Sequence, residues 1–83
     1  MKLSKEDVIL RYLQNKHDIW WIVYNSEVEK SDEMRELICS IGCPGAAYEY
    51  AIVIDCEPHE LTRKASSRDI FYRELYERWE KRC

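Results

Sequence analysis

Apolar residues recur at helical spacing in several short stretches of this chain, and each stretch ends at a residue that stops a helix. One such stripe comprises Met34, Leu37, Ile38 and Ile41, whose positions are separated by three, one and three residues. Ser31 precedes this stripe as a capping residue and Gly42 follows it, so we expect a helix over 32–41. Such short stripes favour a stack of small helices over one long bundle.

Two prolines stand at positions where prolines begin helices. Pro44 precedes a second helical stripe, which comprises Ala47, Tyr50, Ala51 and Ile54. Pro58 precedes Leu61 and Ala65, which we expect to face inward on another helix.

The two ends of the chain also carry helix signals. Ser4 and Asp7 have the spacing of a capping box, which predicts a helix over about 5–15. Its expected apolar face comprises Val8, Ile9, Tyr12 and Leu13. Asp18 is placed to cap the following segment, and the stretch Ser66-Ser67-Arg68-Asp69 is expected to break the chain and cap a last helix over about 68–82. On that last helix Phe71, Leu75 and Trp79 follow one line at intervals of four residues, and Tyr72 and Tyr76 follow the neighbouring line.

Two segments, near 19–24 and 48–54, are rich in β-branched and aromatic residues and also suit strands. We predict an all-α fold of about six short helices in a single domain, 1–83. Its three helix-turn-helix pairs are expected near 4–29, 31–55 and 57–82. An α+β fold with strands at the two ambiguous segments is the alternative.

An internal offset of 24 residues supports the helical prediction. It aligns one set of residues, Glu33, Glu36, Leu37 and Tyr48, with a second, Glu57, Glu60, Leu61 and Tyr72. The segment Pro44-Gly45-Ala46-Ala47-Tyr48-Glu49-Tyr50-Ala51, followed by Pro58-His59-Glu60, resembles short tandem α-helical repeats of bacterial and phage or viral proteins. The resemblance implies stacked helices and a terminal capping repeat where Ile70 and Phe71 replace small residues. It implies no assigned chemistry.

Composition indicates a small protein with a charged surface. Of its 83 residues, 35% are charged, and the longest apolar run, 19–24, is far shorter than the ~18 residues that a membrane helix needs. The polar N-terminus and four irregularly spaced cysteines lead us to expect a cytoplasmic protein with reduced thiols. A domain this small buries only about 60–65% of its unfolded surface, which favours association with another protein or a second copy.

No residue pattern supports catalysis or a bound cofactor. Cys39, Cys43, Cys56 and His59 have a superficial zinc spacing, but a helix over 44–55 would hold Cys43 and Cys56 about 18 Å apart. Cys56 and His59 lack a third, orienting group for nucleophilic catalysis. We therefore predict no catalytic residue, no metal site and no cofactor, and expect the protein not to be an enzyme.

The sequence instead favours a protein-binding module. The charge is uneven, because residues 1–56 carry six Lys or Arg against ten Asp or Glu. The partner-binding residues that we predict are Trp20, Glu27, Glu29, Asp32, Glu33 and Glu36. A phage-type inhibitor that masks a basic host surface by acidic mimicry is a narrower form of this hypothesis. The alternative is a nucleic-acid-binding helix-turn-helix over 57–82, which six interleaved acids disfavour.

Overall fold

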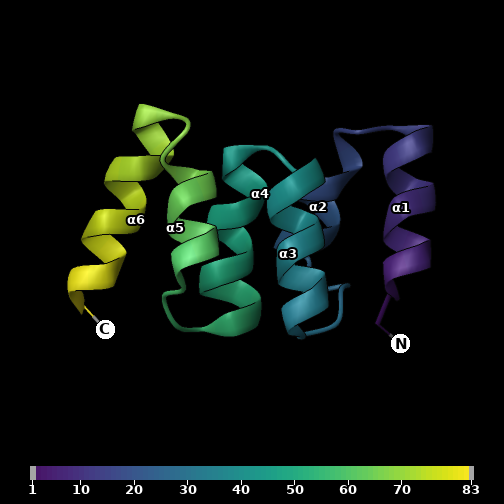
Figure 1. Cartoon of the computed structure of the whole chain (residues 1–83), viewed down its shortest axis with the longest axis horizontal. Coiled ribbons are helices and arrows are strands. Elements are labelled where there is room, and N and C mark those ends of the chain that lie inside the picture. Colours follow the sequence, from purple (N-terminus) through teal and green to yellow (C-terminus); the bar gives the residue numbers. More distant parts are fainter. Residues whose placement is uncertain (1, 83) are drawn as a thin grey trace.

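The structure, a computed structural model, describes residues 2–82, and helices account for most of them. The helices in that range are α1 (Lys5–Gln14), α2 (Asp18–Tyr24), α3 (Asp32–Ile41), α4 (Pro44–Glu49) with its π-helical continuation η1 (Tyr50–Asp55), α5 (Glu60–Ser66) and α6 (Ile70–Arg82) (Figure 1). The prediction of an all-α fold is confirmed. The α+β alternative is wrong, because 19–24 lies in α2 and 48–54 lies in α4 and η1.

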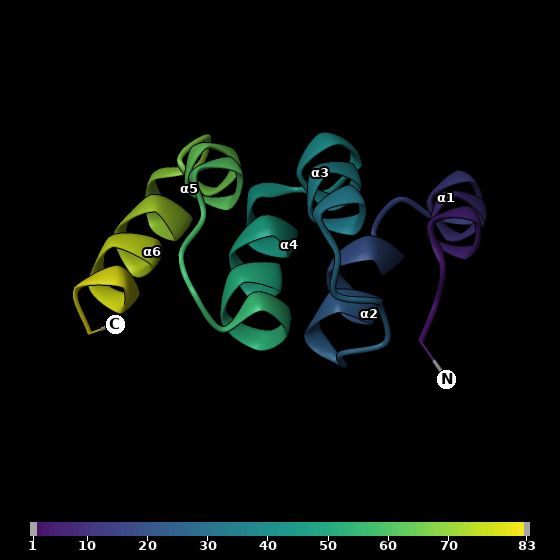
Figure 2. The same ribbon diagram turned by 60° about the horizontal axis from the view of Figure 1, so that its bottom comes forward.

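The helices form two layers. Helices α1, α3 and α5 lie along one side of the molecule, and α2, α4 and α6 lie along the other (Figure 2). Successive helices run in opposite directions, and each helix packs against the next one in its own layer (Figure 1). The result is a short stack of helix hairpins, 34 × 22 × 19 Å in extent.

Side-chain caps explain where several helices begin. The Ser4 hydroxyl accepts the Asp7 N–H at 3.4 Å and the Asp7 carboxylate accepts the Ser4 N–H at 3.2 Å, which completes the predicted capping box. Ser31 caps α3, and the Asp69 carboxylate accepts the Phe71 N–H at 2.9 Å. The prediction for Asp18 is wrong, since Asp18 is the first residue of α2 and lies inside it.

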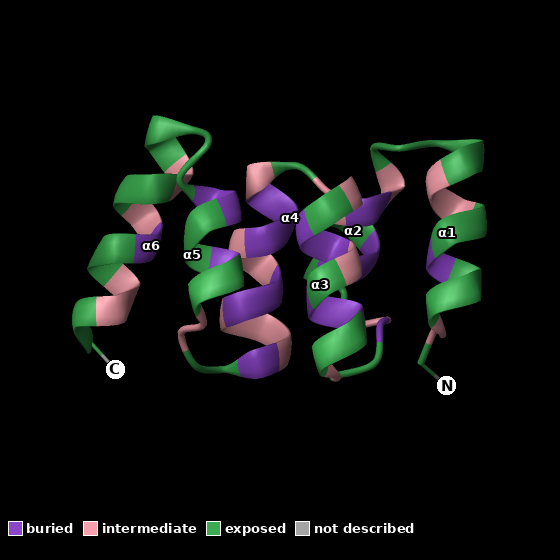
Figure 3. Cartoon of the chain, viewed as in Figure 1, coloured by how far each residue is buried: buried purple, intermediate pink, exposed green. Residues whose placement is uncertain are grey.

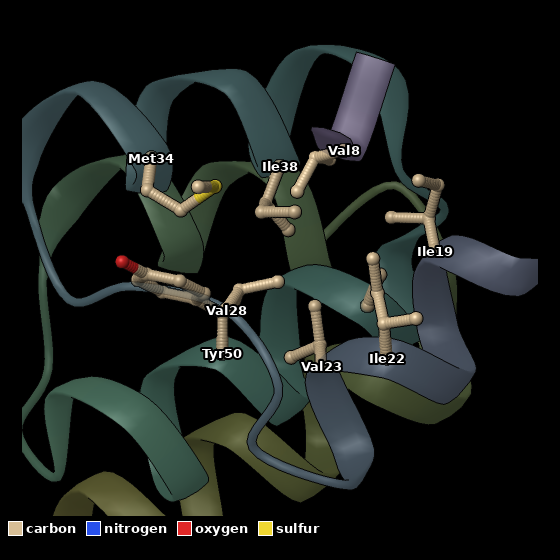
Figure 4. Close-up of a cluster of buried hydrophobic side chains, with 9 residues drawn as sticks. Val8, Ile19, Ile22, Val23, Val28, Met34, Ile38 and Tyr50 are labelled. Carbon is tan, nitrogen blue, oxygen red and sulfur yellow. The ribbon is translucent and has the colours of Figure 1, made fainter. Parts of the chain in front are cut away.

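The main hydrophobic core lies between the first two hairpins, as Figure 4 shows. Its buried members are Val8, Ile19, Ile22, Val23, Val28, Met34, Ile38, Ala46 and Tyr50. A smaller cluster of Cys39, Ala47 and Ala65 joins α5 to the rest. The third hairpin therefore shares much less buried apolar surface with its neighbours than the first two share with each other.

Two buried tyrosines each bind the backbone at the start of another helix, Tyr50 before α3 and Tyr76 before α5. The Tyr50 hydroxyl donates to the Glu29 carbonyl at 3.0 Å and accepts the Ser31 N–H at 3.3 Å, directly before α3. The Tyr76 hydroxyl accepts the His59 N–H at 3.0 Å and lies 2.7 Å from the Thr62 hydroxyl, at the start of α5. Each tyrosine thus satisfies backbone groups that a helix N-terminus leaves without intrahelical partners.

The π-helical turn places a second polar group against α3. Hydrogen bonds from residue i to i+5 bring side chains five positions apart onto one face of the helix, and Tyr50 and Asp55 are both buried. The Asp55 carboxylate accepts two bonds from the Arg35 guanidinium, at 2.7 and 2.9 Å. These bonds raise the pKa of Arg35 above its ordinary value. The pair fixes η1 to α3 in one register.

Gly45 allows the closest approach between α4 and α6. A Cβ atom at this position would lie 2.8 Å from the ring and hydroxyl of Tyr72. A larger residue would displace the end of the Tyr72 side chain, so packing and not backbone conformation favours glycine after Pro44.

Several residues that we expected in the core are exposed. In α5 the buried positions are Thr62, Ala65 and Ser66, while Leu61 is exposed, because the Tyr76 hydroxyl holds Thr62 inward. In α1 only Val8 is buried, whereas Ile9 and Leu13 are exposed, because α1 lies at the end of the stack and packs mainly against α2 and α3 (Figure 3).

The tyrosine hydroxyls yield a stability prediction. We expect Tyr50→Phe and Tyr76→Phe each to lower the free energy of unfolding by about 1–3 kcal/mol, because buried backbone groups lose a partner. Tyr72→Phe is the matched control, since its hydroxyl has no hydrogen-bond partner within residues 2–82, and its effect should stay within about 0.5 kcal/mol. Urea denaturation measures all three, and equal effects would contradict the role assigned to the two buried hydroxyls.

Candidate protein-binding surface

Three aromatic side chains form a stacked cluster on α2. The helix buries Ile19, Ile22 and Val23, which leaves Trp20, Trp21 and Tyr24 on its other sides. The rings of Trp20 and Tyr24 are nearly parallel with centroids 4.9 Å apart, and Trp21 lies 5.8 and 5.9 Å from them. We call these three residues the aromatic cluster.

Exposure within the aromatic cluster is uneven. Trp21 and Tyr24 are 55% and 49% exposed, whereas Trp20 packs partly buried against the main core. The Nε1 atom of Trp20 is buried and has no hydrogen-bond partner within residues 2–82. Of the three rings, Trp21 and Tyr24 therefore offer the larger exposed surface, and Trp20, which the sequence singled out, packs beneath them against the core.

The loop after α2 carries the first two predicted acids in a fixed conformation. The Leu3 N–H donates to the Glu27 carbonyl at 2.6 Å, and the Glu29 N–H donates to the Leu3 carbonyl at 3.4 Å. Val28 between them is buried, and the Tyr50 hydroxyl holds the Glu29 carbonyl. Glu27 and Glu29 thus follow the aromatic cluster directly in the sequence, and hydrogen bonds restrain the backbone of both residues.

The other three predicted acids lie on α3 and have different surroundings. The Asp32 carboxylate, 92% exposed, accepts a bond from Arg35 at 2.8 Å. Glu33 and Glu36 line a shallow cleft of about 220 Å³ whose other residues include Lys5 of α1. The predicted acids therefore do not form one site, and nearby cations offset part of the charge on α3.

A second cleft, of about 300 Å³, opens where the first two hairpin loops meet. Its lining comprises Tyr12, Lys16, His17, Trp20, Ile41, Gly42 and Cys43. Trp20 is the one predicted site residue in this cleft, and the acids of the loop and of α3 are absent from its lining. The cleft combines two aromatic side chains, Tyr12 and Trp20, with the ammonium group of Lys16.

A further group of aromatic residues lies on α4 and α6, and the sequence did not assign it a role at the surface. Tyr48 contacts Tyr72 and Tyr76, with ring centroids 5.9 and 6.4 Å apart. Burial raises the pKa of the Tyr48 and Tyr72 hydroxyls and of the neighbouring Glu49 carboxyl. These rings mainly fill the contact between the two helices.

The cysteines and histidine that suggested zinc do not assemble. Cys43 precedes α4 and Cys56 follows η1, so the two lie at opposite ends of the same continuous helical segment. Cys56 Sγ lies 3.7 Å from the Val53 carbonyl, and His59 Nε2 lies 3.1 Å from Glu57. Within residues 2–82 no three His, Cys, Asp or Glu side chains are arranged to hold a metal ion.

The bases of 57–82 are partly occupied by internal partners. Arg63 pairs with Glu80, and Lys64 pairs with Glu60 at 3.1 Å. Arg68 donates to the Cys39 carbonyl at 2.8 Å, where it ties the third hairpin to the end of α3. Arg73, Arg78 and Lys81 of α6 are not part of these ion pairs, and Arg82 interacts electrostatically with Tyr48.

Comparison with known proteins adds no relative. No protein-family model matches the chain, and no curated protein or solved structure matches it. Within residues 2–82, none of the helices has the combined length and apolar character that crossing a bilayer requires.

Cysteine reactivity distinguishes the buried thiol from the exposed ones. Burial raises the pKa of the Cys39 thiol to about 11, whereas Cys43 and Cys56 are exposed. Because the thiolate is the nucleophile, we expect iodoacetamide at pH 8 to label Cys39 at least about a hundredfold more slowly than a cysteine of ordinary pKa, about 8.5.

Peptide mapping by mass spectrometry measures the labelling at each position. As long as the pH is below the pKa of Cys39, the rate of its labelling should rise about tenfold for each unit by which the pH is raised, because the thiolate fraction rises in the same proportion. In denaturant the difference between Cys39 and Cys43 should vanish. Equal labelling of the two in the folded protein would mean that Cys39 is not enclosed by α3, α4 and α5.

Proposed function

We propose that this protein is a non-enzymatic protein-binding module that engages its partner through the aromatic cluster and the adjacent loop acids, Glu27 and Glu29. The observation that carries the proposal is the exposure of Trp21 and Tyr24 as stacked rings on a helix. Exposed tryptophan and tyrosine side chains are favoured anchors of protein interfaces because they bury a large area and have few rotatable bonds.

Preorganisation supports the proposal further. Stacking against Trp20 restrains the two exposed rings, and the Leu3 and Tyr50 contacts restrain the loop. A surface that is already ordered loses less conformational entropy when a partner binds.

The chemistry of the surface favours a partner that presents arginine or lysine side chains. A cation over the face of Trp21 or Tyr24 gains a cation–π interaction, and the same group can form an ion pair with a carboxylate on the loop. In its narrower form the proposal is a phage-type inhibitor that acts in the cytoplasm and covers a basic groove of a host protein. The charges of Glu27 and Glu29 support this form, and the free thiols of Cys43 and Cys56 suit a reducing compartment.

Nucleic-acid binding by 57–82 is the alternative function. Internal partners occupy Arg63, Lys64 and Arg68, and the remaining bases alternate along α6 with Glu74, Glu77 and Glu80. A concentrated positive face is the expected feature of a nucleic-acid interface, so the charge pattern favours the protein partner. Retention on an oligonucleotide column that falls steeply with salt would favour the alternative instead.

Affinity capture with matched variants tests the proposal. The tagged protein is compared with Trp21→Ala/Tyr24→Ala and with Glu27→Lys/Glu29→Lys, and bound proteins are quantified by mass spectrometry. We expect at least one captured protein to fall by about tenfold or more with both variants, as loss of an interface anchor implies.

The control variant is Glu74→Lys/Glu77→Lys, which makes the same charge change at exposed acids of α6. Capture should be retained in this control, and circular dichroism should show equal helix content in all four proteins. Capture that is lost equally in the control would indicate a general charge effect. Capture that survives both test variants would refute the proposed surface.

A further inference from the structure

The cleft of about 300 Å³ lies between the turn that joins α1 to α2 and the turn that joins α3 to α4, at one edge of the molecule (Figure 1). Three of its lining residues, Tyr12, Trp20 and Ile41, are partly buried and pack against the main core. The deeper part of the cleft is therefore mostly apolar and includes two aromatic rings. Sites for small molecules are concave and have mainly apolar and aromatic walls of this kind.

The exposed part of the lining is polar and carries a positive charge. Lys16, His17 and Cys43 are the exposed lining residues. Among the residues that the structure describes, no carboxylate pairs with Lys16 and no Asp or Glu lines the cleft. Asp18, the nearest acid in the sequence, lies on α2 outside the lining. An unpaired ammonium group favours an anionic partner, and His17 adds an N–H donor in either protonation state.

Hydrogen bonds hold both turns in place. In the first turn the Asp18 N–H donates to the Asn15 carbonyl and the His17 N–H donates to the Asn15 side-chain oxygen, each at 3.0 Å. In the second turn the Gly42 N–H donates to the Ile38 carbonyl at 2.8 Å. A cleft whose walls are already ordered loses little conformational entropy when a ligand binds.

We infer that this cleft binds a small ligand with a planar apolar body and an anionic group. The body lies against Tyr12, Trp20 and Ile41, and the anionic group pairs with Lys16. This site goes beyond the proposed function, because its occupant is a small molecule. Trp21 and Tyr24, which carry the proposed contact with a protein partner, are outside its lining.

A titration with naphthalenesulfonate, followed by NMR on the whole chain, is the first test. This probe has a planar apolar body and one negative charge, and we expect a dissociation constant on the order of 1 mM for a ligand of its size. The backbone amides of His17 and Gly42 and the indole N–H of Trp20 should shift in a saturable way. The indole N–H of Trp79, on α6, is the internal control and should not shift.

Charge reversal tests the pairing with Lys16. Lys16→Glu should raise the dissociation constant about three- to tenfold, because an attractive charge becomes a repulsive one. Lys81→Glu is the matched control, since it makes the same change at an exposed lysine of α6, and it should leave the dissociation constant unchanged. The naphthylmethylammonium ion, with the same ring and the opposite charge, should bind the parent protein more weakly than the sulfonate does. The amide spectra verify that both variants are folded.

Thiol protection gives a second, independent measurement. Cys43 lines the cleft, whereas Cys56 is exposed outside it. Naphthalenesulfonate should slow the labelling of Cys43 by iodoacetamide in proportion to the occupied fraction and leave the labelling of Cys56 unchanged.

Four outcomes overturn the inference. They are the absence of saturable shifts at the cleft, equal affinity for the two naphthalene ions, equal effects of Lys16→Glu and Lys81→Glu, and equal protection of Cys43 and Cys56. The measurements need no protein partner, so none of these outcomes bears on the proposed function.

Discussion

The helices within residues 2–82 are too short to be more than marginally stable alone, so the structure depends on contacts between neighbouring helices. Helix α6, with thirteen residues, is the longest within 2–82, and isolated helices shorter than about 12–15 residues are marginal in water. Polar contacts add direction to this packing. Tyr50, Tyr76 and the Arg35–Asp55 pair each connect one hairpin element to a defined position on another. Without such contacts a stack of short amphipathic helices could slide in register.

The sequence predicted the fold class because its signals for helix ends were physically specific. A capping box at Ser4, a cap at Ser31 and a proline at position 44 each correspond to a helix start in the structure. The sequence could not settle 19–24 by residue type, because β-branched and aromatic residues in a short apolar run suit either state. Burial against α1, α4 and η1 determines the helical state there.

The details that the sequence did not predict depend on contacts between distant residues. The π-helical form of 50–55 satisfies Tyr50 and Asp55 together, and nothing in the local pattern signals the extra residue in the turn. The offset of 24 residues aligns Tyr48 with Tyr72, whose rings do lie 5.9 Å apart, but the two tyrosines with equivalent roles, Tyr50 and Tyr76, are not aligned by it. For the candidate surface, the sequence singled out Trp20, but which of the two adjacent tryptophans is exposed depends on how α2 is rotated against the core.

The unequal division of the core has a consequence for motion. Residues of the first two hairpins share the main cluster, while α5 and α6 are attached by a smaller cluster, the Arg68 contact and the packing of Tyr72 and Tyr76 against Tyr48. Opening of the third hairpin leaves the main cluster buried, whereas global unfolding exposes it, so the partial opening has the smaller free energy. Amide protons of α6 should therefore exchange with solvent through partial opening, while those of α3 wait for global unfolding. The first two hairpins, which carry the aromatic cluster, therefore stay folded while the third hairpin opens locally and closes again.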